Sequence, residues 1–121
     1  MHAIDNNFML DIRIRIFLSD NLLIFGKGVA QLLHQCEMTN SLHKAAKELN
    51  MRYSKALLLL NRAEQGFKQQ LLERRIGGKD GGGSTLTPFG KRLLDEYLKA
   101  EKEICEFAAG RLKQIVEMSI P

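Results

Sequence analysis

The stretch from Thr39 to Gln69 constrains the fold of this 121-residue chain more than any other part of its sequence. An apolar pattern at helical spacing begins there. Ser41 stands just before it and can accept a hydrogen bond from a free N–H of the first helical turn. Asn50 follows the pattern, and asparagine tolerates the left-handed backbone that ends a helix. A second and longer apolar pattern begins two residues later, so the stretch predicts two helices joined by a tight turn.

Each of the two expected helices has one apolar face. The faces consist of Leu42, Ala45, Ala46 and Leu49 in the first helix and of Ala56, Leu60, Ala63 and Phe67 in the second, which is expected over residues 52–69. The small alanines let another helix cross closely, and Met51 is expected to fill the turn. This is the pattern of a helix-turn-helix, whose second helix can enter the major groove of DNA.

Composition limits the alternatives. With 45% hydrophobic residues the chain can build the core of one small domain, and its net charge of +4 is compatible with nucleic acid without requiring it. Cys36 and Cys105 share no metal-ligand spacing with the three histidines, so we expect two reduced thiols, no metal site and no cofactor. No apolar run approaches the roughly 20 residues of a membrane span, and charged residues interrupt the N-terminal apolar positions, so we expect a cytoplasmic protein.

The N-terminal part predicts a β-hairpin followed by a helix. Residues 1–7 are polar and expected to be frayed. Apolar and charged residues alternate from Leu10 to Leu18, which is typical of a half-buried strand, and residues 22–25 can return after a turn at residues 19–21. Gly26 and Gly28 then open a helix with a buried stripe of Val29, Leu32, Leu33 and Cys36. The Gly-Lys-Gly sequence here lacks the spacing of a P-loop.

A second hairpin is expected directly after the helix-turn-helix. Residues 71–76 and 84–86 read as two strands around a glycine-rich turn, and a hairpin in this position is a wing. Arg74, Arg75 and Lys79 give it positive charge. The alternative is an unstructured loop with ordinary solvated charges. A dinucleotide-binding loop is excluded because that loop follows a strand and leads directly into a helix.

The C-terminal part predicts one long amphipathic helix. Thr87 can cap it, Pro88 suits its first position, and the pattern continues to about Met118. We therefore divide the chain into a domain over residues 1–87 and a helix over residues 88–121. The small domain cannot cover the whole apolar stripe, so we expect a homodimer interface made by Leu94, Tyr97, Leu98, Ile104, Cys105, Ala108, Leu112 and Ile115. The alternative is a helix that folds back on its own domain.

With these elements in this order, the chain resembles the N-terminal DNA-binding domain of the molybdate-responsive, ModE-type transcriptional regulators, which are relatives of the LysR-type winged helix-turn-helix. The most specific residues run from Leu72-Glu73-Arg74 through the glycine-rich segment 77–83 to Leu86-Thr87-Pro88-Phe89-Gly90. The resemblance covers roughly residues 10–97. It implies a dimer that binds an inverted-repeat operator and acts in transcription. The family carries its molybdate site in a separate C-terminal domain, so molybdate sensing is not expected of these 121 residues.

The sequence thus predicts an α+β, mainly α, winged helix-turn-helix that binds double-stranded DNA. Residues at the start of the recognition helix reach furthest into the groove, and we expect base contacts from Arg52, Tyr53, Ser54 and Lys55. Phosphate contacts are expected from Ser41, His43, Lys44, Arg62, Arg74, Arg75 and Lys79.

The sequence also bears on two other classes of function. A protein-interaction adaptor remains open, because winged-helix domains also serve that role and because Leu58 or Leu59 must be exposed within the run of four leucines. An enzyme is not expected, since the sequence suggests no catalytic triad or paired carboxylates. Glu64 and Glu73 are interpreted as surface charges.

Overall fold

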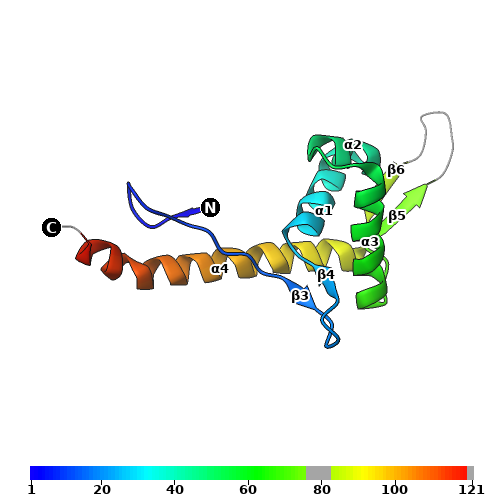
Figure 1. The fold of residues 1–121 in the computed structure, drawn as a ribbon. Coiled ribbons are helices and arrows are strands. Elements are labelled where there is room, and N and C mark those ends of the chain that lie inside the picture. Colours follow the sequence, from blue (N-terminus) through cyan, green and yellow to red (C-terminus); the bar gives the residue numbers. More distant parts are fainter. Residues whose placement is uncertain (76–82, 120–121) are drawn as a thin grey trace.

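The computed structural model describes residues 1–75 and 83–119, and within these residues the fold is mainly helical with short antiparallel hairpins (Figure 1). The elements in chain order are β1 (His2–Ala3), β2 (Met9–Leu10), β3 (Ile16–Phe17), β4 (Leu23–Phe25), α1 (Lys27–Thr39), α2 (Leu42–Glu48), α3 (Tyr53–Phe67), β5 (Leu72–Arg75), β6 (Gly83–Leu86) and α4 (Pro88–Met118). The predicted fold class, an α+β winged helix-turn-helix, is confirmed.

The core lies where α1, α3 and the first turns of α4 meet. Leu32, Leu33 and Cys36 on α1 are fully buried, as the stripe predicted. Phe25 at the end of β4 is also fully buried and packs edge-to-face on two rings, with centroid distances of 5.0 Å to Tyr97 and 6.1 Å to Phe67. The β3–β4 hairpin, α3 and α4 are therefore joined around one aromatic residue.

The helix-turn-helix forms as predicted from local signals. The Ser41 side chain accepts a hydrogen bond from the main-chain N–H of Lys44 (3.1 Å), and Asn50 has the left-handed φ of 52° that turns the chain after α2. The recognition helix α3 begins and ends within the predicted range of 52–69. Arg52 is its N-cap, and Lys68 closes it in a left-handed conformation with φ of 57°.

The wing is attached to the rest of the domain by hydrogen bonds at its base. Strands β5 and β6 pair from Leu72 opposite Leu86 to Arg75 opposite Gly83. The main-chain N–H of Ser84 donates to the carbonyl of Asn40 (2.9 Å), which holds β6 beside the junction of α1 and α2. The glycine-rich tip of the predicted wing, including Lys79, lies outside the described residues.

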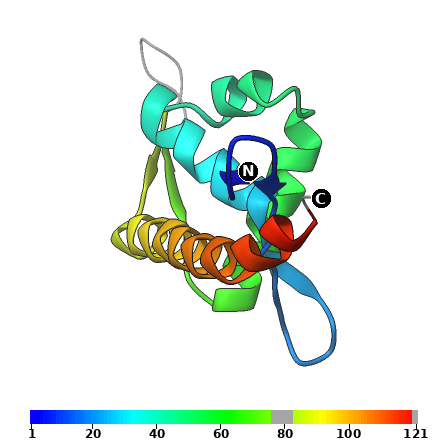
Figure 2. The same cartoon turned by 90° about the vertical axis from the view of Figure 1, so that its left-hand side faces the viewer.

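The N-terminal segment differs from its prediction. Residues 1–7 are not frayed, because β1 pairs with β2 and this small hairpin lies over the C-terminal half of α4 (Figures 1 and 2). Residues 10–18 do not form one continuous strand either. The return strand β4 has only three residues and can pair only with β3, so the segment before β3 follows α4 instead of a sheet. Its alternation of half-buried and exposed residues is nevertheless confirmed, and the carbonyl of Ile14 accepts a hydrogen bond from the Tyr97 hydroxyl (2.7 Å).

The last helix begins inside the domain and continues well past it (Figure 1). The main-chain N–H of Gly90 donates to the Thr87 hydroxyl oxygen (3.0 Å), so the predicted cap is confirmed. Gly90 also lets the helix pass the wing, since an added Cβ would lie 2.3 Å from the carbonyl oxygen of Leu71. Within the part of the chain that the structure describes, no helix combines the length and the apolar character needed to cross a membrane.

Candidate nucleic-acid interface

The start of the recognition helix is exposed, and a ring stack orders one of its side chains. Arg52, Ser54 and Lys55 are exposed, whereas Tyr53 is half-buried. The imidazole of His43 on α2 lies parallel to the Tyr53 ring, with a centroid distance of 3.7 Å and an interplanar angle of 3°. The stack occupies one face of the Tyr53 ring. Tyr53 is thus positioned by α2, and its hydroxyl is the part that can reach a ligand.

The outward face of α3 carries an apolar residue among polar ones. Ser54, Leu58 and Asn61 recur at spacings of four and three and are all exposed, which puts them on one side of the helix. Leu58 is 48% exposed, whereas Leu59 is half-buried against the core. The prediction that one of these two leucines would be exposed is therefore confirmed. Because of Leu58, this face can make apolar as well as polar contacts.

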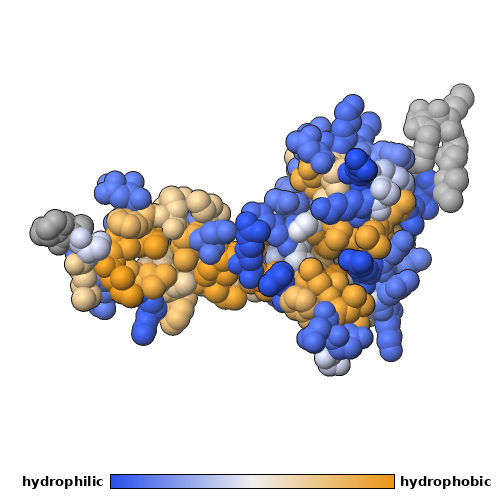
Figure 3. Space-filling view, viewed as in Figure 1, coloured by the Kyte–Doolittle hydropathy of each residue, from blue (hydrophilic) through white to orange (hydrophobic). Residues whose placement is uncertain are grey.

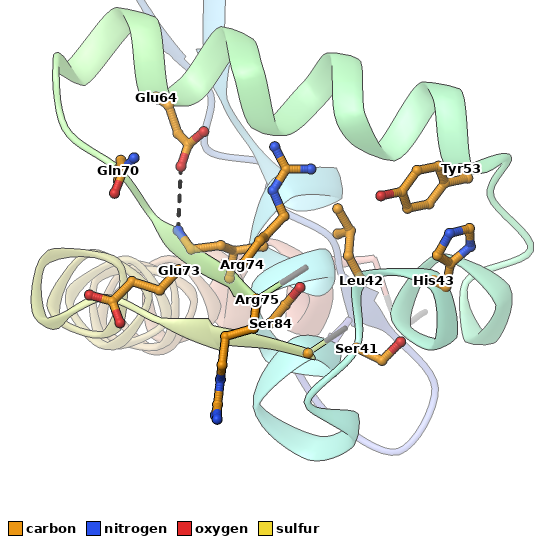
Figure 4. A pocket seen from close by; sticks show the side chains of 12 residues that line it. Ser41, Leu42, His43, Tyr53, Glu64, Gln70, Glu73, Arg74, Arg75 and Ser84 are labelled. Carbon is orange, nitrogen blue, oxygen red and sulfur yellow. Dashed lines mark hydrogen bonds between the residues drawn. The ribbon is translucent and has the colours of Figure 1, made fainter. Parts of the chain in front are cut away.

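A groove of about 620 Å³ separates the helix-turn-helix from the wing (Figure 4). Arg74 and Arg75 line it from β5, with their side chains pointing to opposite sides of the strand, and Ser41, His43 and Tyr53 line its opposite side. The remaining lining residues are Leu42, Glu64, Gln70, Leu72, Glu73, Gly83 and Ser84. The structure thus brings five of the predicted DNA-contacting residues to one groove, although they are spread over residues 41–75 of the sequence.

Glu64 has a role that the sequence interpretation missed. Its carboxylate is half-buried, and Oε2 accepts hydrogen bonds from the main-chain N–H groups of Leu71 (2.8 Å) and Leu72 (3.4 Å), one of which is drawn in Figure 4. The interpretation of Glu64 as a surface charge is wrong, because this side chain joins the last turns of α3 to the start of the wing. Glu73, by contrast, is exposed.

The other predicted contact residues lie around this groove or apart from it. Lys44 is exposed on α2 next to His43. Arg62 is exposed on the flank of α3 that faces away from the wing, where it lines a separate groove beside β4. Lys79 lies outside the described residues. The groove between the helix-turn-helix and the wing is therefore lined by the side of α3 that faces the wing, and Arg62 lies on another side of the helix.

The residues expected at a dimer interface divide into two groups. Leu94 and Tyr97 are buried in the core of this chain and Cys105 is buried farther along α4, so these three have little surface left for a second subunit. Leu98, Ile104 and Ile115 are exposed, whereas Ala108 and Leu112 are half-buried. Two further apolar residues that were not predicted, Phe107 and Met118, are 71% and 83% exposed. Figure 3 shows apolar surface along this part of α4.

Burial governs the chemistry of the thiol in the core. It raises the pKa of Cys36 to about 11, so this thiol stays neutral and poorly reactive near pH 7. Burial, with a smaller contribution from Glu101, also raises the pKa of the Tyr97 hydroxyl. Neither group offers a nucleophile, which fits the role of both residues in packing.

A helix-turn-helix followed by a two-stranded wing defines the chain as a winged helix-turn-helix protein. No protein-family model matches it. The transcriptional regulator ModE of Haemophilus influenzae is 37% identical over 87 residues, which is 72% of this chain and 34% of that protein. The DNA-binding transcriptional dual regulator ModE of Escherichia coli is 36% identical over 66 residues, 54% of this chain and 25% of that protein. A protein of Azotobacter vinelandii named molybdenum transport protein ModE is 31% identical over 84 residues, covering 69% of this chain and 31% of the relative.

The chain is therefore homologous to the ModE transcriptional regulators over their N-terminal portion. It spans about a third or less of the length of these relatives.

Proposed function

We propose that the chain binds double-stranded DNA sequence-specifically as a homodimer and regulates transcription in the cytoplasm. The observation that carries this proposal is the groove between the recognition helix and the wing. There, the exposed Arg74 and Arg75 of β5 lie opposite the exposed His43 of α2. The half-buried Tyr53 of α3 also lines the groove, and the exposed Arg52, Ser54 and Lys55 are its neighbours at the start of the same helix. The homology to ModE regulators supports the same function.

The recognition helix supplies the base contacts in this proposal. Arg52, Ser54 and Lys55 enter the major groove, and a bidentate contact from Arg52 to guanine provides about 1–3 kcal/mol of discrimination. The Tyr53 hydroxyl, held by the ring stack with His43, binds a phosphate or a base edge. Arg52, Ser54 and Lys55 are the exposed side chains at the start of α3.

The wing and α2 supply the phosphate contacts. Arg74 and Arg75 on β5 lie across the groove from Ser41 and His43, so that one strand of the duplex can be contacted from both sides. The Ser41 hydroxyl oxygen accepts the capping bond from Lys44, and its own proton remains able to bond a phosphate oxygen. Phosphate contacts fix the register of the helix in the groove and supply most of the affinity.

The second subunit contacts the free part of α4. Leu98, Ile104, Phe107 and Ile115 are large apolar residues that water covers in the single chain, and a second copy of α4 offers the same surface. A two-fold dimer of this kind places two recognition helices about one helical turn of DNA apart, roughly 34–36 Å.

Selection from random duplexes at about 150 mM salt tests this proposal. Enrichment of an inverted repeat with half-sites one turn apart is expected. The variant R52A/K55A is expected to keep its fold and lose this enrichment, because it removes both basic side chains from the start of the helix. The matched control K99A/K102A removes two exposed lysines from α4 and is expected to select the same sequence. Wild-type protein that retains no duplex even at low salt contradicts the proposal.

A protein-interaction adaptor is the second candidate, and the exposure of Leu58 favours it. A leucine in the middle of the outward face of α3 suits a protein partner. The R52A/K55A variant separates the two candidates. Loss of duplex binding with an unchanged fold supports DNA readout, whereas loss of a protein partner with duplex binding retained supports the adaptor.

A further inference from the structure

A second basic surface flanks the recognition helix on the side away from the wing. A groove of about 220 Å³ opens between the β3–β4 hairpin, the start of α1 and α3. Its floor is apolar and includes Val29 and Leu59. Its rim carries four basic side chains, Arg13, Arg15, Lys27 and Arg62, all exposed. None of the residues that line it is shared with the groove at the wing.

The charge of this rim is largely uncompensated. Among the residues that the structure describes, Arg15, Lys27 and Arg62 take part in no ion pair, whereas Arg13 pairs with Asp11 at 3.3 Å. The Arg15 guanidinium lies over the Phe17 ring, 5.4 Å from its centroid, so a cation–π contact holds the charged group itself at the exposed rim. Like charges gathered on one surface repel one another, and a polyanion relieves that repulsion.

The part of this rim that lies on α3 is next to the helix face that is proposed to contact the bases. Lys55, Leu59 and Arg62 recur at spacings of four and three and share one side of the helix. Tyr53 and Glu64 line the wing groove on the other side, and the exposed face with Leu58 lies between the two grooves. A helix that inserts this face into the major groove has one DNA backbone on each of its flanks.

The distance along the helix agrees with this arrangement. Arg62 follows Lys55 by seven positions in α3, which corresponds to about 10.5 Å along the helix axis. The major groove is about 12 Å wide, so a helix that enters it by its first turn crosses the bordering backbone two turns later. In this arrangement Arg62 lies next to the phosphates that border the major groove, and the β3–β4 hairpin and the start of α1 lie beside it.

We infer that Arg13, Arg15, Lys27 and Arg62 form a second phosphate-binding surface, which holds the DNA backbone on the side of the recognition helix opposite the wing. This rests on the proposed function, since it needs α3 to lie in the major groove. The surface contacts no base. It adds affinity equally on every sequence and helps to fix the angle at which α3 enters the groove.

The variant R15A/K27A of the full chain tests this inference by the salt dependence of DNA binding. Neither residue has been assigned to base contact, and both side chains are exposed. Removing two phosphate contacts is expected to lower the slope of log K against log salt by about 1.8 per bound subunit. That slope corresponds to binding weaker by on the order of 30-fold per subunit at about 150 mM salt. The loss is expected to be the same on the selected operator and on a scrambled duplex, and ethylation of the phosphates flanking the half-site is expected to affect the variant less than wild type.

The control K99A/K102A removes the same charge from α4 and is expected to keep the wild-type slope. Circular dichroism and urea unfolding establish that both variants are folded. A slope for R15A/K27A equal to that of the control overturns the inference. So does a loss confined to the operator, because that assigns these residues to sequence readout. If wild type binds DNA, R52A/K55A binds it more weakly and R15A/K27A binds it as tightly as wild type, the second phosphate-binding surface is refuted and the proposed function stands. If wild type binds no duplex, the proposed function fails first.

Discussion

Replacing Glu64 by alanine is expected to separate the wing from the recognition helix and to destabilise the fold. The 2.8 Å bond joins a carboxylate to the main-chain N–H of Leu71, a residue with no exposed surface, so its N–H is left without this partner in the variant. A bond to a charged group contributes about 1.5–3 kcal/mol. The 3.4 Å bond from Leu72 is longer than the usual range and adds little. We expect a loss of about 2 kcal/mol, or about 8 °C in Tm for a domain of this size.

Urea unfolding at fixed protein concentration measures this loss. The control Gln65→Ala changes the next residue, which is exposed on the same helix, and accounts for the effect of alanine on the helix itself. Glu64→Gln keeps an acceptor oxygen but not the charge, and we expect it to lose less than about 1 kcal/mol. The reasoning is refuted if the unfolding free energies of Glu64→Ala and Gln65→Ala differ by less than about 0.5 kcal/mol, because the carboxylate then does not anchor the wing.

Three further predictions follow from the helix faces and the core. We expect Leu58 to contact a thymine methyl group, which is the apolar group on a base edge in the major groove. Uracil in place of thymine in the selected operator should then weaken wild type several-fold and leave Leu58→Ala unchanged, and equal effects on both proteins would count against this contact. Ile115→Glu places a charge on the exposed apolar stripe of α4 and is expected to give a monomer in analytical ultracentrifugation, whereas Lys113→Gln, with the same change in charge, keeps the dimer. Because burial raises the pKa of Cys36 to about 11, its contribution to stability is complete below about pH 9 and is lost as the pH rises towards 11. The unfolding free energy of wild type should then fall by up to about 3 kcal/mol more than that of Cys36→Ala over this range, and parallel profiles would show that the thiol is not the cause.

Local signals accounted for the helix-turn-helix and for the start of the last helix. Ser41 and Thr87 cap helices through main-chain N–H groups three residues away, and Asn50 turns the chain through its own φ. Such interactions lie within one helical turn, so a sequence window contains all the atoms involved. The buried stripe of α1 was equally predictable because it has the helical period.

Contacts between residues in different elements were not predicted. Glu64 accepts a hydrogen bond from Leu71, seven residues later and just before β5, a spacing that no helical or strand period describes. The first seven residues looked frayed because they are polar, yet β1 has a partner in β2 and a support in α4. The second basic surface joins the segment before β3 to α1 and α3, and its four cations are spread over 50 residues of sequence.

By itself, the sequence determined the helix-turn-helix, the start of the last helix and the class of fold, because caps, turns and apolar periods act between near neighbours. Only the tertiary structure decided which charges gather on each side of the recognition helix and which part of α4 remains exposed. Those properties depend on how separate elements pack around Phe25, and distances between packed elements are not encoded in any local pattern.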